Sequence, residues 1–108
     1  MRYLMMSMAN DTAPDEALYA EMGRFIEEMT AAGVLLATGG LEPGGTRITS
    51  VGDEITVVDG PFAETKESVG GFALIEVSSK EQAIELSRRF RRIVGDGTTI
   101  MQQVFGPE

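Results

Sequence analysis

The sequence predicts an α+β fold in which an antiparallel sheet carries two helices on one of its faces. Two segments repeat apolar residues at helical spacing, and the remaining apolar segments are short and bounded by Gly, Pro, Asn or Asp, as strands are. The resulting order is strand, helix, hairpin, strand, helix, strand, which is a split βαβ arrangement. Because βαβ crossovers are right-handed, both helices are expected on the same face of the sheet.

The composition is that of one ordinary globular domain, spanning residues 1–108. Cysteine and histidine are both absent, which excludes disulfides, thiolate or imidazole metal sites, and Cys or His catalysis within this sequence. The formal net charge of −8 argues against nucleic acid and anionic membrane as partners. No stretch approaches the ~20 apolar residues of a membrane span. We therefore expect a cytoplasmic protein with no cofactor and no metal.

The first strand and the first helix are predicted in the first third of the chain. The strand covers Arg2–Met8. Thr12 and Asp15 have the spacing of a capping box, and Pro14 suits the first turn of a helix that ends near Gly33. The side of this helix that faces the core is expected to carry Leu18, Met22, Phe25 and Met29.

A loop and a hairpin are predicted in the middle of the chain. The short apolar run Val34–Ala37 leads into a glycine-rich loop over Thr38–Thr46. The segments Thr46–Val51 and Glu54–Val58 flank Gly52-Asp53, a two-residue turn typical of hairpins. Pairing through this turn places Ile48, Ser50, Ile55 and Val57 on one side and Arg47, Thr49, Glu54 and Thr56 on the other.

The last third of the chain is predicted to form strand, helix and strand. Gly71–Val77 is almost entirely apolar on both faces, as a strand in the middle of a covered sheet is. Ser79 and Gln82 form a second capping box, and the helix ends at Gly95. Its buried side is expected to carry Ala83, Leu86, Phe90 and Ile93. Thr98–Phe105 supplies the final strand, and the whole order is ferredoxin-like.

Two helices cover only one face of this sheet, although several of its strands are apolar on both faces. The uncovered face would be an apolar patch of the kind that monomers rarely expose. A second copy that packs sheet to sheet would cover it and give a homodimer. In the alternative, Val34–Ala37 and Glu64–Glu67 fold over this face within one chain.

The segment Asp59–Glu67, with the sequence DGPFAETKE, is the part of the chain richest in chemically active groups. It places four ionisable groups within nine residues, beside a Gly-Pro turn. A lysine close to carboxylates can position an anion or shift a pKa for proton transfer. Asp59 and Lys66 are therefore the candidate catalytic residues, and the candidate ligand-binding residues are Tyr3, Pro61, Phe62, Glu64 and Glu67. The same residues would also suit a solvated turn.

These nine residues resemble the signature of the YCII-related proteins of the DGPF type. The resemblance extends to Arg2-Tyr3-Leu4-Met5, Ala32-Gly33-Val34-Leu35 and Gly71-Phe72, and so to essentially the whole chain. It implies a ferredoxin-like fold that dimerises into an α/β barrel. Some members of the YCII group resemble small lyases or dehydrochlorinases that use a His and Asp pair, of which only Asp59 is available here. Members encoded near extracytoplasmic-function sigma factors imply a regulatory context.

Three functions remain open at this point. The first is a small-molecule lyase or isomerase with its pocket at Asp59–Glu67. The second is a non-catalytic dimeric module that binds a small ligand or a regulatory protein, which the missing histidine and the acidic surface favour. In the third, the signature Asp59–Glu67 has only a structural role and closes the rim of the barrel.

Overall fold

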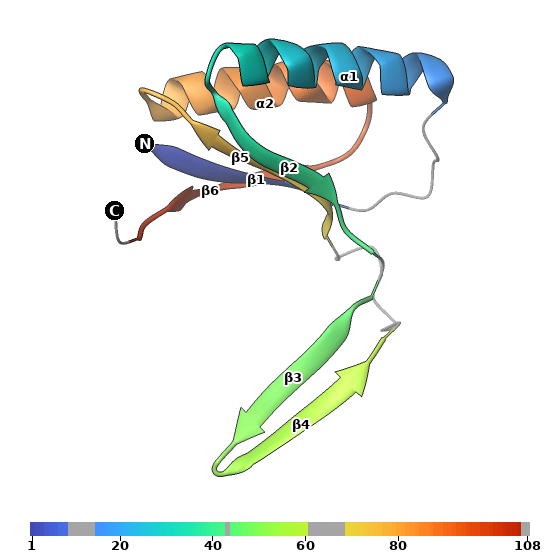
Figure 1. Ribbon diagram of the computed structural model, residues 1–108, viewed down its shortest axis with the longest axis vertical. Coiled ribbons are helices and arrows are strands. Elements are labelled where there is room, and N and C mark those ends of the chain that lie inside the picture. The colour runs from blue at the N-terminus through green and yellow to red at the C-terminus, as the bar shows by residue number, and fades with distance from the viewer. Residues whose placement is uncertain (9–14, 43, 61–68, 107–108) are drawn as a thin grey trace.

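The computed structural model describes residues 1–8, 15–42, 44–60 and 69–106, which form a two-layer α+β structure (Figure 1). Its elements are β1 (Arg2–Met8), α1 (Glu16–Ala31), β2 (Leu35–Gly40), β3 (Thr46–Val51), β4 (Glu54–Asp59), β5 (Val69–Glu76), α2 (Lys80–Val94) and β6 (Thr99–Val104). Four strands form an antiparallel sheet in the order β2-β5-β1-β6, and both helices cover the same face of it. The predicted ferredoxin-like class is confirmed.

The strand β2 corrects the prediction of a loop from Thr38 onwards. β2 continues through Gly39 and Gly40 because these residues pair with Phe72 and Gly71 of β5. The segment predicted as the short run Val34–Ala37 therefore contributes an edge strand and does not fold across the open face of the sheet. The other segment considered for that role, Glu64–Glu67, lies outside the described residues.

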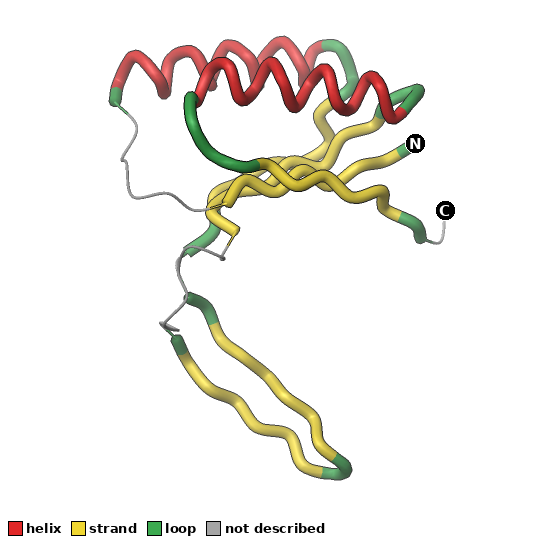
Figure 2. Tube along the Cα trace, turned by 180° about the vertical axis from the view of Figure 1, so that it is seen from behind, coloured by secondary structure: helices red, strands yellow, loops and turns green. Residues whose placement is uncertain are grey.

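The hairpin has the predicted register but does not join the main sheet. Ile48 pairs with Val57 and Ser50 with Ile55, and β3 and β4 form a two-stranded sheet of their own. Figures 1 and 2 show this hairpin projecting away from the sheet on the side opposite the helices. The radius of gyration is 15.9 Å, whereas a compact domain of this length has a value of about 13 Å.

The hydrophobic core lies between the helices and the sheet. β1 sends Tyr3 and Met5 into it, so Leu4 and Met6, which alternate with them, face the opposite side. The buried core residues are Tyr3, Met5, Met29, Ile75, Val77, Ala83 and Leu86. Phe25 of the first predicted apolar stripe and Phe90 of the second pack against this cluster.

The helix ends follow the local chemistry of the sequence, with one correction. The cap of α1 is Asp15 itself, whose Oδ1 accepts a hydrogen bond from the Leu18 N–H at 2.8 Å; the predicted cap Thr12 lies outside the described residues. Gly33 ends this helix at φ 74°, and the Val34 N–H donates to the Met29 carbonyl at 3.0 Å. No helix in the described part of the chain is long and apolar enough to cross a membrane.

α2 begins at the predicted capping box. The Gln82 N–H donates to Ser79 Oγ at 3.1 Å. The Gln82 side chain returns to the preceding residue, where its Oε1 accepts from the Ser78 N–H at 2.8 Å. These bonds fix the start of α2, and thereby the position of the helix layer over the sheet.

Candidate ligand-binding site

A cavity of about 880 Å³ lies between the helix layer and the sheet. Its apolar walls come from both layers and include Met5, Met22, Phe25, Ile26, Met29, Ile75, Leu86 and Phe90. Ala73 faces the same space from the middle of β5, because it shares the helix-facing side of that strand with Ile75. The helices therefore do not pack against the sheet along their whole length.

The size of this cavity shows that it is not a sealed, dry void. A void left in a packed core costs about 24 cal/mol for each Å³. For 880 Å³ that cost is about 21 kcal/mol, more than the ~5–15 kcal/mol by which a whole domain is stable. The space must therefore be occupied by solvent or by a ligand.

Polar groups gather at one end of the cavity. Ser7 of β1 pairs with Gly71 of β5, and Gly71 pairs with Gly40 of β2. The last residues of β1 and β2 therefore lie beside the first residues of β5 at this end of the cavity. Ser7 Oγ lies 3.4 Å from Thr99 Oγ1, and the Arg91 guanidinium donates to the same Thr99 hydroxyl at 3.3 Å. Ser7 and Arg91 both line the cavity, so this end offers a hydroxyl and a cation.

Glycine keeps this end of the cavity open. Gly71 faces the helices from β5, and a Cβ there would lie 3.3 Å from the Gly39 carbonyl oxygen. A side chain at this position would press on the backbone of β2 and fill the space in front of Ser7. The pairs Gly39-Gly40 and Gly70-Gly71 all contribute to the cavity wall.

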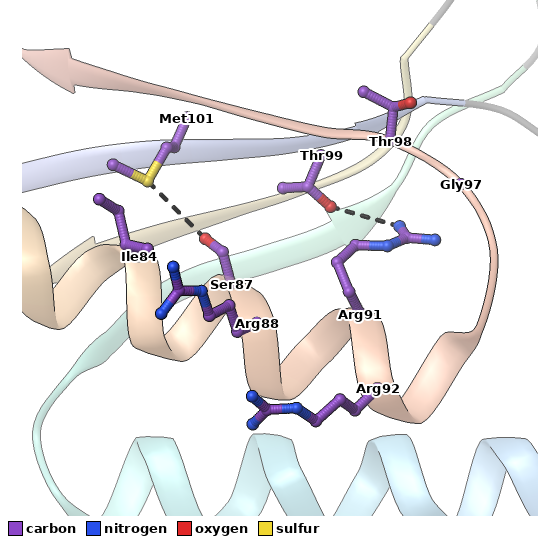
Figure 3. Close-up of a pocket in the computed structure, with 9 residues that line it drawn as sticks. All are labelled: Ile84, Ser87, Arg88, Arg91, Arg92, Gly97, Thr98, Thr99 and Met101. Atoms are coloured by element: carbon purple, nitrogen blue, oxygen red, sulfur yellow. Dashed lines mark hydrogen bonds between the residues drawn. The ribbon is translucent and has the colours of Figure 1, made fainter.

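A second, shallower depression lies between α2 and β6 and is lined by three arginines (Figure 3). Arg88 forms an ion pair with Glu85 at 2.6 Å. Arg91 turns toward Thr99 in Figure 3 and also donates to the Gly95 carbonyl at 2.7 Å, whereas the Arg92 side chain extends away from Thr99. Arg91 and Arg92 lie in the last turn of α2, where cations complement the helix dipole. The larger cavity is therefore the stronger candidate site.

The model of the YCII-related domain family matches residues 1–102. The chain belongs to the YCII-related family. It is 36% identical over 77 residues to the uncharacterised protein R00369 of Rhizobium meliloti, an alignment that covers 68% of this chain and 61% of that protein. The predicted family membership is thus confirmed.

The fold of this YCII-related chain is similar to that of a solved enzyme. The structure is 5-chloro-2-hydroxyhydroquinone dehydrochlorinase from Burkholderia phenoliruptrix, in complex with 2,5-dihydroxybenzoquinone. The TM-score is 0.57 with 15% sequence identity, over 99% of this chain and 96% of that one. At this identity the likeness establishes the fold.

The predicted site residues that the structure describes do not line the cavity. Tyr3 is only 4% exposed and belongs to the core. Asp59 is exposed at the root of the hairpin, where its Oδ1 accepts a hydrogen bond from Thr46 Oγ1 at 2.7 Å. Two further predicted site residues, Lys66 and Phe62, lie outside the described residues, as do Pro61, Glu64 and Glu67.

No sequence motif indicates the polar end of the cavity. Ser7 and Arg91 carry no motif, and their proximity depends on the pairing of β1 with β6 and on the contact of α2 with Thr99. The two Gly-Gly pairs are the signal that the sequence does contain. On the part of the wall that the structure describes, Arg91 and Tyr19 are ionisable and no carboxylate is present.

Proposed function

We propose that this YCII-related chain binds a small, largely apolar ring compound in the cavity between its helices and its sheet. The observation that carries the proposal is the cavity itself, whose volume of about 880 Å³ lies within the ~300–1,000 Å³ of small-molecule sites. Apolar walls with a few polar groups at one end are also the usual composition of such sites.

The arrangement of the walls indicates the chemistry of the ligand. Phe25 and Phe90 offer aromatic surface, and Met22 and Met29 adapt their shape to a ring. Arg91 would bind an oxygen or anionic substituent, because a guanidinium has five N–H donors and it uses only part of them on Thr99 and Gly95. The dehydrochlorinase of similar fold holds 2,5-dihydroxybenzoquinone, a ring with oxygen substituents, which supports this ligand class.

Binding of such a ring tests the proposal directly. We expect 2,5-dihydroxybenzoquinone to raise the melting temperature saturably, because a ligand at about 100 times its Kd stabilises the folded state by about 2.7 kcal/mol. Arg91→Gln should weaken binding of this ring about 10-fold, the ratio that corresponds to ~1.4 kcal/mol. Calorimetric titration of both proteins measures the ratio.

Two controls make this titration decisive. Arg92→Gln removes a neighbouring charge that does not line the larger cavity and should leave the affinity unchanged. Toluene, a ring without oxygen, should bind wild type and Arg91→Gln equally. The proposal fails if neither ring binds the wild-type protein, or if Arg92→Gln weakens binding as much as Arg91→Gln does.

The second candidate is catalysis on the bound ring, as a lyase or isomerase. The dehydrochlorinase of similar fold and the four ionisable groups of Asp59–Glu67 favour it. Asp59 would serve as the acid or base and Lys66 would position an anion, with Tyr3, Pro61, Phe62, Glu64 and Glu67 as ligand contacts. The absence of a carboxylate from the described wall favours a binding module without catalysis.

Substitutions in the signature segment separate these two functions. If the chain is an enzyme, Asp59→Asn and Lys66→Ala should each lower kcat for a bound compound by 100-fold or more. The melting temperature of Asp59→Asn should stay within error, because Asp59 is exposed. The conversion of each compound that binds, measured by chromatography, gives this kcat. Equal turnover by Asp59→Asn and wild type would remove Asp59 from the mechanism.

A further inference from the structure

Arg91 lies between the two hollows described above, the larger cavity and the depression between α2 and β6. Among the described residues it is the only one that lines both of them. The depression has a volume of about 580 Å³ and is open to solvent. Thr99 lines the depression, Ser7 lines the cavity, and their hydroxyl oxygens lie 3.4 Å apart. The two hollows therefore meet at a chain of three polar side chains.

The guanidinium of Arg91 is held in place on the side of the depression. It donates to Thr99 Oγ1 at 3.3 Å and to the Gly95 carbonyl at 2.7 Å. A Cβ at Gly97 would collide with this guanidinium, so glycine at that position leaves the space that the side chain occupies. Arg91 is half-buried, whereas the Arg88 side chain is 61% exposed. Because these bonds use only part of its five N–H donors, the others are available to a ligand.

The depression carries more positive charge than the end of the helix requires. Its described lining contains Arg88, Arg91 and Arg92 and no carboxylate. Glu85 offsets Arg88 through their ion pair. Arg91 and Arg92 then face only the roughly half negative charge at the C-terminal end of a helix. Asp96 lies in the bend that follows α2, outside this lining. On a chain whose net charge is −8, the depression is therefore a local positive site.

An oxyanion such as phosphate matches this lining. Guanidinium N–H groups bind phosphate oxygens through paired, charge-assisted hydrogen bonds, and the Thr98 hydroxyl lines the same depression as a further donor. Figure 3 shows the Arg92 side chain extending away from Thr99. Arg91 is therefore the residue that contacts the anion. Arg88 and Arg92 act through their charge, which is felt over about 10 Å at 0.1 M salt.

We propose that the depression binds a phosphate anion on Arg91, and that this anion weakens the binding of a ring in the larger cavity. The second half rests on the proposed function, in which Arg91 binds an oxygen of the ring. One guanidinium then serves two ligands from opposite sides, and the donors and charge that it gives to phosphate are lost to the ring. This coupling is reciprocal, so the ring raises the Kd of phosphate by the same factor. Ring binding thereby depends on the phosphate concentration.

Equilibrium dialysis against radioactive phosphate tests the site without any ring. At constant ionic strength, set with sodium chloride, the wild-type chain is expected to bind phosphate saturably, at one anion per chain. Arg91→Gln should raise the Kd about 10-fold, because it removes the contact. Arg92→Gln should raise it about 3-fold, because it removes a nearby charge. Arg92 is exposed, so this variant tests the site even if Arg91→Gln fails to fold.

Arg24→Gln is the matched control for the loss of one positive charge. Arg24 lies on α1 and lines neither hollow, so its replacement should leave the Kd of phosphate unchanged. A wild-type chain that binds no phosphate saturably would overturn the proposal. So would an Arg92→Gln protein whose Kd equals that of Arg24→Gln.

The effect on the ring is measured by calorimetric titration of 2,5-dihydroxybenzoquinone in saturating phosphate and in chloride of equal ionic strength. Phosphate should raise the Kd of the ring about 3- to 10-fold, with the ratio for Arg91→Gln as the upper bound. The two buffers should give equal values for the Arg91→Gln protein, and for toluene on the wild type.

The same titration distinguishes the two proposals. If the wild-type chain binds phosphate and the Kd of the ring is equal in both buffers, the coupling is refuted and the proposed function stands. If the ring does not bind in chloride, the proposed function fails and the coupling fails with it. The dialysis then decides the phosphate site by itself.

Discussion

Tyr3→Ala is expected to lower the free energy of unfolding by about 3–5 kcal/mol, the cost of removing a buried aromatic side chain. Tyr3 is 4% exposed and packs in the core cluster with Met5 and Ile75. A domain of this size is stable by only ~5–15 kcal/mol. The variant should therefore unfold at a markedly lower urea concentration than the wild type.

Tyr3→Phe is the matched control. No hydrogen bond of the Tyr3 hydroxyl occurs within the described residues, and none of the buried side-chain oxygens there lacks a partner, so this hydroxyl reaches solvent. Its removal should change the stability by less than about 0.5 kcal/mol. Urea titrations of Tyr3→Ala and Tyr3→Phe measure the free energy of unfolding, and this decides whether Tyr3 is a core residue or a ligand contact. A Tyr3→Ala protein of wild-type stability that no longer binds the ring would favour the ligand contact predicted from the sequence.

The sequence predicts correctly those parts of the fold that depend on near neighbours. The register of the hairpin follows from the two-residue turn Gly52-Asp53, and the start of α2 from the spacing of Ser79 and Gln82. The buried residues Met29, Ala83 and Leu86 all lie on the predicted apolar sides of their helices. Each of these features is set by residues within a few positions of one another.

The errors concern features that depend on distant partners. Gly39-Gly40 reads as a loop because glycine is unfavourable in a strand, but β5 supplies Gly71 opposite it, and the two backbones approach closely. Nothing local indicates that the hairpin leaves the main sheet.

The sequence predicts a site at Asp59–Glu67, where it is richest in ionisable groups. The cavity has a different origin, since it depends on the separation between two layers and on small residues such as Ala73 in its floor. The charged segment and the cavity are therefore separate observations. The substitutions Asp59→Asn and Lys66→Ala test whether this segment acts on a ligand bound in the cavity.

The same change, alanine to leucine, is expected to have opposite effects at two positions of the fold. Ala83 is 0% exposed in α2 and lies outside the cavity wall, so the added carbons of Ala83→Leu have no space. This overpacking should lower the free energy of unfolding by about 1–3 kcal/mol. Ala73 faces the cavity, and Ala73→Leu can bury its three added carbons there. At ~0.8 kcal/mol for each carbon, the stability should stay unchanged or rise by up to about 2 kcal/mol.

Ala73→Leu should also lower the affinity for the ring compound at least 10-fold, because its side chain occupies the space that the ligand needs. Loss of binding together with a gain in stability has a single physical explanation, namely that the ligand and the leucine compete for one cavity. Urea unfolding and calorimetric titration of the two leucine variants measure both quantities. If Ala73→Leu destabilises the protein as much as Ala83→Leu does, the helices already pack against the sheet at this point. The solution structure would then have no room for a ligand, and the proposed function would fail together with the cavity.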